Sequence, residues 1–280
     1  MSRLCSGDIR RRAMTVPASR DASQTPSTLR HVMALLRVTA ACGARGAGID
    51  DYLDATELSR PTIYRLLKGL REEGFLRPSP LRHRYLLGYE LLVLGAEAGN
   101  GAQLRDLARP RLLALAQRLG GSFYLFAHDG RHAVCLEIQN GAYPVGGFVA
   151  SIGGRVPLGV GQASIALLAS LEARERAWIL EANRECLMRD YAIDVDAVRR
   201  EIDYCHAHGH ARGVEGSSLP EFTGLAMPLL GPGERCLGAF SCSLLKSRLS
   251  EAHRATLITA MASEVAGLKA DLHGLLQPES

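Results

Sequence analysis

The segment from Ser59 to Gly74 constrains the fold of this chain more than any other stretch of the sequence. Ser59 is suited to cap a helix N-terminus, and Pro61 fits the first turn because no intrahelical N–H donor is needed there. Gly74 suits the position after a helix C-terminus. The apolar residues between these ends fall on one face: Ile63, Leu66, Leu67 and Leu70. The spacing therefore predicts a helix over about residues 60–73 with one buried face and one polar, basic face.

Shorter elements are predicted on both sides of this helix. Apolar residues at helical spacing run from Leu29 to Val38 and stop at the glycine-rich residues 43–48, and a short helix follows at about 50–56. The glycine-rich segment resembles a phosphate-binding loop, but no strand precedes it, which favours a turn between helices. Residues 75–77 and 84–87 are typical of two short strands. Three helices and a hairpin predict a winged helix-turn-helix domain at residues 27–88.

The charge is distributed unevenly along the chain. Residues 1–90 hold 15 Lys and Arg against 9 Asp and Glu, whereas residues 91–280 hold 18 against 20. The first part therefore carries an excess of +6, while the rest carries −2. A basic segment of this kind suits a polyanion such as nucleic acid, although solvated surface arginines give the same count. Residues 1–26 lack apolar periodicity and are predicted to be a disordered basic arm.

The remaining composition excludes several classes of protein. The seven cysteines are scattered without a C-x-x-C pair, which argues against a disulfide framework or a zinc finger. No apolar run approaches the roughly 18 residues of a membrane span, and the N-terminus lacks the apolar core of a secretory signal. We expect a cytoplasmic protein that does not contact membranes.

The second part of the chain mixes strands and helices. A linker helix is predicted at residues 89–101, and a helix at 104–119 is expected to be interrupted or kinked at Pro110. Four strand-like runs follow, at residues 122–127, 133–138, 225–229 and 237–243. Helices are predicted at about residues 162–171, 172–183, 195–206 and 250–275. An α+β fold is expected, with residues 102–276 forming a ligand-sensing domain.

Several motifs in this order resemble the IclR family of transcription regulators. In the first domain these are Leu58 to Leu67, Leu70 to Phe75 and Tyr85 to Gly88. In the second they are Gly154 to Gly161 and Gly224 to Leu229. The resemblance implies a winged helix-turn-helix joined to a GAF-like α/β effector-binding domain, assembled as a homodimer or a dimer of dimers. The sequence departs from the family at Glu57, where a glycine is common, at two prolines in the wing, and at Ser164-Ile165, where Gly-Lys is common.

The basic helix and the wing carry the predicted contacts with double-stranded DNA. Arginine can bond guanine edges in the major groove, whereas lysine and hydroxyl groups position the protein on phosphates. Two alternatives remain open, because Tyr64 can pack between helices and Arg65 can pair with an acid inside the domain. A dimer would read a pseudo-palindromic operator. The predicted DNA-binding residues are Arg60, Thr62, Tyr64, Arg65, Lys68, Arg82 and Arg84, with His83 also on the wing.

A site for a small carboxylate or aromatic-acid effector is predicted in the second domain. Glycines before the helix at residue 162 would let a ligand approach free backbone N–H groups, although packing of a tight turn explains them too. Ser241 and Ser243 share one strand face, opposite Cys242; the resemblance places them in the effector pocket, and bonding to backbone is the alternative. Phe148 and Leu225 are further candidates or simple core, and the role of Glu215 is doubtful. The predicted effector-binding residues are Gly161, Gln162, Ala163, Ser164, Met227, Ser241 and Ser243.

The main rival interpretation is an enzyme or a nucleotide-binding protein that uses the second domain. The residues around Gly161 resemble a dinucleotide fingerprint, but a preceding strand and an acid about 20 residues later are not convincing. The sequence contains no G-x-S-x-G, H-E-x-x-H or P-loop motif, so we predict no catalytic residues and no cofactor. His206, His208 and His210 run from a helix end into Gly209, which favours a solvated turn over a metal site.

Overall fold

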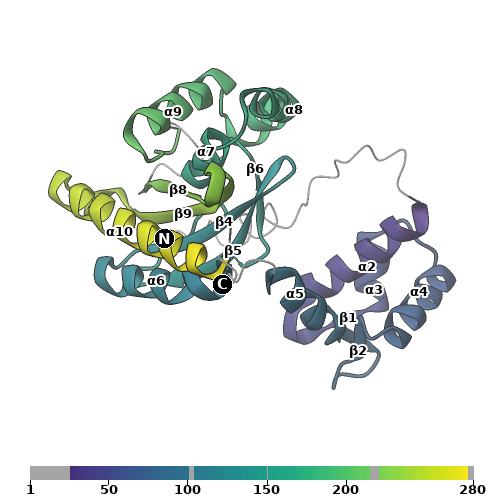
Figure 1. The fold of residues 1–280 in the computed structure, drawn as a ribbon. Coiled ribbons are helices and arrows are strands. Elements are labelled where there is room, and N and C mark those ends of the chain that lie inside the picture. Colours follow the sequence, from purple (N-terminus) through teal and green to yellow (C-terminus); the bar gives the residue numbers. More distant parts are fainter. Residues whose placement is uncertain (1–25, 101–103, 150, 215–220, 277–280) are drawn as a thin grey trace, which may run out of the picture. The chain divides into compact units, whose positions relative to one another are not determined.

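The computed structural model describes residues 26–100, 104–149, 151–214 and 221–276. The chain divides into two compact units, one containing described residues 26–100 and the other the described residues from Leu104 onward (Figure 1). The predicted basic arm at residues 1–26 lies outside the described residues, except for Pro26. No helix in the described part of the chain is long and apolar enough to cross a membrane.

The first unit consists of helices around a small sheet. Helix α2 spans Ser27–Cys42, α3 spans Ile49–Ala55 and α4 spans Arg60–Glu72, each close to its predicted position. Strands β2 (Leu76–Pro78) and β3 (Arg84–Leu87) form the predicted hairpin, and α5 (Glu90–Asn100) follows. The winged helix-turn-helix prediction is therefore confirmed in its elements.

The glycine-rich segment before α3 differs from the prediction of a simple turn. It contains a 3-10 turn at Gly43–Arg45 and then the short strand β1 (Ala47–Gly48). Strand β1 pairs antiparallel with β3, so that the sheet order is β1-β3-β2. Two residues have no detectable periodicity, and a strand that exists only through a distant partner cannot be recognised locally.

The apolar face of α4 lies in the core of this unit, as its spacing predicts. Ile63, Leu67 and Leu70 are buried together with Leu35 of α2. Tyr52 of α3 is also fully buried, and its hydroxyl lies 2.8 Å from the Thr39 hydroxyl, which bonds the Leu35 carbonyl. The buried tyrosine thereby joins α3 to α2 without an unpaired polar atom.

The second unit is built on an antiparallel sheet. Its main strands are β4 (Ser122–Asp129), β5 (His132–Asn140), β8 (Ala226–Leu230) and β9 (Cys236–Leu245). Two short strands that were not predicted, β6 (Arg155–Pro157) and β7 (Phe222–Thr223), complete it. The order is β6-β5-β4-β9-β7, and β8 also pairs with β9.

Helices cover both faces of this sheet (Figure 1). One layer contains α7 (Gly161–Ala169), α8 (Ala173–Tyr191) and α9 (Val195–His208), and the other contains α6 (Leu104–Leu119) and α10 (Glu251–Leu276). Two separate apolar cores result, one on each side of the sheet. Helix α6 continues through Pro110, so the interruption that was predicted there as the alternative to a kink is wrong.

Alternation along β9 decides which core each of its side chains enters. Ala239 belongs to the core beside α7 and α9, whereas Phe240, Cys242 and Leu244 belong to the core beside α6 and α10. Because successive side chains point to opposite faces, Ser241 lies on the α7 side. The α+β prediction is confirmed, and the sheet carries its polar wall toward α7.

Candidate DNA-binding surface and internal cavity

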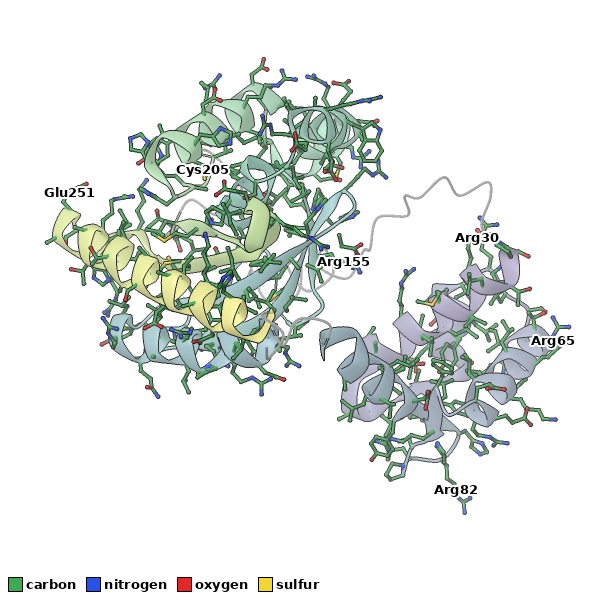
Figure 2. All side chains as sticks on the ribbon, viewed as in Figure 1. Arg30, Arg65, Arg82, Arg155, Cys205 and Glu251 are labelled. Atoms are coloured by element: carbon green, nitrogen blue, oxygen red, sulfur yellow. The ribbon has the colours of Figure 1, made fainter. Side chains whose placement is uncertain are left out.

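The polar face of α4 is free of the core of its unit. Tyr64 is 51% exposed, and Arg65 and Lys68 are exposed as well (Figure 2). Tyr64 therefore does not pack between helices, and no ion pair of Arg65 occurs among the described residues. Both alternatives left open by the sequence are thus decided in favour of an accessible surface.

Three of the predicted residues of α4 make local contacts. Arg60 lies 3.2 Å from Asp50 and Lys68 lies 3.8 Å from Glu72, and all four side chains are more than half exposed. Exposed pairs of this kind contribute little and can be exchanged for a phosphate. Thr62 is half-buried, and its hydroxyl lies 2.9 Å from the Ser59 hydroxyl instead of leaving that group to cap a backbone N–H.

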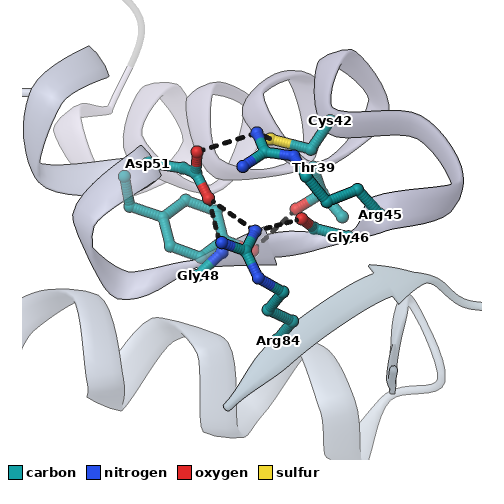
Figure 3. Close-up of polar contacts among 8 residues, drawn as sticks. Thr39, Cys42, Arg45, Gly46, Gly48, Asp51 and Arg84 are labelled. Carbon is teal, nitrogen blue, oxygen red and sulfur yellow. Dashed lines mark hydrogen bonds and ion pairs between the residues drawn. The ribbon is translucent and has the colours of Figure 1, made fainter. Parts of the chain in front are cut away.

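The two wing arginines have different surroundings. Arg82 is exposed at the hairpin and extends away from the ribbon (Figure 2). Arg84 instead donates to the Gly46 carbonyl at 2.8 Å and to Asp51 at 3.0 Å (Figure 3). This placement favours a structural role for Arg84 over the predicted DNA contact, because its guanidinium is already held inside the unit.

Asp51 is the centre of that polar cluster (Figure 3). Its carboxylate accepts bonds from the Gly48 N–H at 2.8 Å and from Arg45 at 2.9 Å, in addition to Arg84. The Gly48 N–H, and then Arg45 and the charge of Arg84, lower the pKa of Asp51 below its ordinary value of 3.8. The cluster fastens β1 and the wing strand β3 to the start of α3.

The turn between α3 and α4 forms without a glycine. Glu57 occupies the position where a glycine is common, yet it is not among the described residues with positive φ. The turn geometry that this departure put in question is therefore accessible to an ordinary residue. Helices α3 and α4 contact each other, as a helix-turn-helix requires.

The second unit contains a cavity of about 910 Å³ on the α7 side of its sheet. Its walls come from β4, β9, α7, α9, the segment after β5 and the start of α10. This volume is within the usual range for small-molecule sites, roughly 300–1,000 Å³. Most of the predicted effector residues line it, namely Gly161, Gln162, Ala163, Ser241 and Ser243, together with Phe148.

The polar wall of the cavity offers free hydroxyl groups. Ser241 and Ser243 are buried residues that line the cavity, and no hydrogen bond of either hydroxyl to another described residue is observed. The backbone-bonded alternative is therefore not what the described residues show. Tyr124 lies opposite Ser241 in the sheet and donates to the Val145 carbonyl. Gln162 joins α7 to β9 by donating to the Cys242 carbonyl at 2.6 Å.

Glycine is required at the start of α7. Gly161 has φ +73°, and a Cβ there would lie 3.2 Å from the Phe148 ring. The ring of Phe148 in turn meets Tyr191 edge-on. Gly161 thus lets an aromatic side chain close over the first turn of α7, which brings the backbone N–H groups of that turn beside the cavity.

Two predicted effector residues lie elsewhere. The Ser164 hydroxyl is fully buried and bonds the carbonyls of Val160 and Gly161 while accepting from the Gly159 N–H, so it holds the turn before α7. Met227 pairs with Phe240 in the sheet and packs in the core beside α6, away from the cavity.

Leu225 belongs to the same core as Met227 and also does not line the cavity. Glu215 lies outside the described residues. The outcome for Met227 and Leu225 has one cause: strand alternation fixes relative faces within a strand, but the sequence does not reveal the register between β8 and β9.

Several residues that line the cavity were not predicted. Tyr124 and Phe126 of β4 supply aromatic surface, and α9 supplies Arg200 and Tyr204. Residues 197, 200, 201 and 204 of α9 recur at helical spacing, so the sequence alone places them on one face of the helix. The sequence does not indicate that this face lines the cavity.

The predicted solvated histidine turn is confirmed for His206 and His208, which are exposed, whereas His210 is buried. The His208 ring stacks on Tyr204 with centroids 3.9 Å apart, and Arg212 lies 3.6 Å above the same tyrosine ring. His210 is buried and meets Tyr204 edge-on. Within the described residues, no group of three or more His, Cys, Asp or Glu side chains is arranged to hold a metal ion.

Comparison with known families matches both units of the chain. Residues 28–80 match the IclR helix-turn-helix domain, and residues 97–267 match the C-terminal domain of the bacterial transcriptional regulator IclR. The chain belongs to the IclR family. It is a DNA-binding transcription regulator, and α4 is the second helix of its helix-turn-helix.

Individual relatives of this IclR-family regulator agree with the assignment. The HTH-type transcriptional regulator XynR of Escherichia coli is 26% identical over 215 residues, which cover 74% of this chain and 82% of XynR. The glycerol operon regulatory protein of Streptomyces coelicolor is 28% identical over 189 residues, covering 67% and 73% of the two chains.

Solved structures share the fold of the regulator. An IclR homolog from Microbacterium hydrocarbonoxydans, complexed with 4-hydroxybenzoate, has a TM-score of 0.74 at 20% identity, covering 89% of this chain and all of that one. The Thermotoga maritima IclR gives 0.70 at 18% identity, covering 88% and 98%. At these sequence identities, the structural similarity is evidence for a shared fold alone.

Proposed function

We propose that this regulator binds a pseudo-palindromic operator and that a small organic acid in the cavity changes its affinity for that DNA. The cavity carries the effector part of the proposal, because it combines aromatic walls with free serine hydroxyls beside the first turn of α7. A carboxylate is suited to those hydroxyls and to the positive end of a helix. The complex of an IclR homolog with 4-hydroxybenzoate supports an acid of this kind.

The DNA part of the proposal rests on the accessible face of α4. Tyr64, Arg65 and Lys68 point away from the core, and an α-helix fits the major groove, which is roughly 12 Å wide. Arg65 is the candidate for guanine edges, while Lys68 and Arg82 are candidates for phosphates. Arg84 is proposed to support the wing instead.

The proposed assembly is a homodimer or a dimer of dimers. Helix α5 supports it, because its large apolar residues Leu92, Val93 and Leu94 are exposed, as is Tyr89 just before the helix. Exposed apolar groups of this size commonly mark protein contacts. Light scattering across a range of concentrations measures the assembly, and a stable monomer would contradict it.

A DNA-binding titration with and without acids tests the proposed function. Fluorescence anisotropy should show binding to DNA flanking the regulator's own gene. Nuclease footprinting on the same DNA should show a protected region with two-fold symmetry. Addition of 4-hydroxybenzoate or another small carboxylate should shift the apparent Kd for DNA, because only a ligand with different affinities for two states moves their equilibrium. Binding of an acid without any change in DNA affinity would contradict the effector role.

A further inference from the structure

One part of the cavity wall is strongly charged. Its charged residues come from α9, from the segment after α9, and from the junction between β9 and α10. We call this group the charged wall, and it consists of Arg200, Glu201, Arg212, Lys246, Glu251 and Arg254. Segments far apart in the sequence therefore converge on one side of the same cavity.

The two carboxylates of the charged wall already have partners. Glu201 accepts bonds from Arg212 at 2.9 and 3.2 Å, which is a bidentate ion pair. Glu251 lies 3.9 Å from Arg254 and is 96% exposed at the N-terminal end of α10 (Figure 2). Each carboxylate therefore offsets one arginine.

Arg200 and Lys246 remain uncompensated. Both line the cavity and both are exposed to solvent, and neither forms an ion pair with a described residue. The charged wall, taken over the described residues, thus has four cations and two carboxylates and a net charge of +2. A ligand with one negative charge would neutralise only half of this excess.

Two arginines of the charged wall, Arg212 and Arg254, lie close to one another. Burial lowers the pKa of His210, and the charges of Arg212 and Arg254 lower it further, so both guanidiniums lie near this one ring. Arg212 also stacks on Tyr204, which lies one turn beyond Arg200 on α9. Arginine and lysine gathered on a concave wall raise the local concentration of anions.

The rest of the cavity is suited to a different part of a ligand. Phe126 and Phe148 supply apolar surface, whereas Ser241 and Ser243 supply hydroxyls beside the first turn of α7. A molecule that fills the cavity would therefore meet an apolar region and a hydroxyl-bearing region as well as the charged wall.

We propose that the effector is an organic dianion with an apolar middle, one anionic group lying at Ser241 and Ser243 and the other at Arg200 and Lys246. This rests on the proposed effector function of the same cavity and adds the charge class of the ligand. The second anionic group forms charge-assisted hydrogen bonds to cations that no described carboxylate neutralises. A dicarboxylate with its two groups at opposite ends has this chemistry.

Calorimetry on the full-length regulator tests the dianion with probes of matched shape. Benzoate is the monoanion and terephthalate is the dianion with a carboxylate at each end, whereas phenyl phosphate carries both of its charges at one end. We expect one terephthalate per chain, bound at least about tenfold more tightly than benzoate, because two exposed ion pairs each contribute a few-fold in affinity. Comparison of terephthalate with phenyl phosphate distinguishes two separated anionic groups from a double charge on one group, and we expect terephthalate to bind more tightly.

Charge-neutral variants locate the second anionic group. Arg200→Gln and Lys246→Gln should each weaken binding of the preferred dianion about fivefold and leave benzoate within about twofold. The matched control is Arg199→Gln, because Arg199 precedes Arg200 on α9 but pairs with Asp196 at 2.7 Å and does not line the cavity. This control should bind all probes as the wild type does.

Three results would overturn the proposal. They are benzoate binding as tightly as terephthalate or twice per chain, a preference for terephthalate that survives in the variant carrying both Arg200→Gln and Lys246→Gln, and absence of terephthalate binding. An acid that changes DNA affinity without any dianion preference would contradict the dianion alone. Failure of every acid to change DNA affinity would instead contradict the proposed function.

Discussion

At the residue scale, the exposed polar face of α4 leads to a prediction about salt dependence. Lys68→Ala should weaken binding to all DNA sequences alike and reduce the slope of log K against log salt by about one, because one phosphate contact is lost. Anisotropy titrations at several salt concentrations measure this slope.

Glu72 provides the control for Lys68. Its carboxylate lies 3.8 Å from the Lys68 ammonium, so Glu72→Gln frees the lysine without altering it. DNA affinity should stay the same or rise in this variant. A salt slope that is unchanged by Lys68→Ala would remove Lys68 from the phosphate contacts.

The carboxylate of Asp51 leads to a prediction about pH. Its pKa is lowered in the folded state, so its contribution to stability is present above the ordinary value of 3.8 and is lost as pH falls through the folded value. Asp51→Asn should reduce the free energy of unfolding by about 1 kcal/mol at neutral pH, because it removes the ion pairs with Arg45 and Arg84.

Denaturation of the full chain at several pH values from 7 down to about 2 tests Asp51. The difference between Asp51→Asn and the wild type should shrink as the pH falls below 3.8 toward the lowered pKa, where the wild-type carboxylate protonates. Asp50→Asn is the matched control, because Asp50 is 81% exposed and, among the described residues, pairs with Arg60 alone. An equal loss in both variants would contradict the role of Asp51 at the centre of the cluster.

At the scale of elements, two serines at the start of α7 and on β9 are predicted to have different roles: Ser164 stabilises the turn before α7, and Ser241 binds the effector. Ser164→Ala leaves the buried Gly159 N–H without its acceptor, so we expect a loss of about 1–3 kcal/mol in the free energy of unfolding. Ser241→Ala removes a hydroxyl that has no partner among the described residues, so stability should change by less than about 0.5 kcal/mol.

Effector affinity, unlike stability, should depend strongly on the Ser241 hydroxyl. Loss of a hydrogen bond to a charged group costs about 1.5–3 kcal/mol, so the effector should bind Ser241→Ala at least about tenfold more weakly. Thermal melts and calorimetry on both variants make the comparison. Destabilisation by Ser241→Ala comparable to that of Ser164→Ala would show that the Ser241 hydroxyl serves the fold.

The helices of the molecule were predictable because their evidence is local. The apolar spacing of α4 gave its buried face correctly, and the alternation of β9 correctly placed Ser241 and Ser243 together. Strands β1, β6 and β7 were missed because each has only two or three residues and depends on a partner strand. A strand of that length carries too little pattern to identify.

At the scale of the whole molecule, the proposed coupling between effector and DNA can be tested at α5. Leu94→Pro removes a backbone donor from the interior of this helix and costs about 3 kcal/mol of helix stability. We expect effector affinity to remain within about twofold of the wild type, while DNA affinity no longer responds to the effector. Leu94→Ala, which retains the helix, is the control and should respond normally.

Two measurements on each variant complete this test. Calorimetry gives effector affinity, and anisotropy gives DNA affinity with and without effector. If Leu94→Pro instead loses most of its effector affinity, α5 supports the cavity and does not carry the effect of the ligand to the DNA-binding unit. If the effector still changes the DNA affinity of Leu94→Pro as it does in the wild type, the helix is not required for coupling.

The sequence by itself determined the elements with strong periodicity, the basic character of the first unit and the faces within single strands. These depend on residues a few positions apart, whose relation the backbone geometry fixes. Tertiary structure alone decided that Met227 faces away from the cavity, that Arg84 is held by Asp51, and that Arg200 and Lys246 meet the same cavity. Such outcomes depend on strand register and on contacts between distant segments, which no local pattern records.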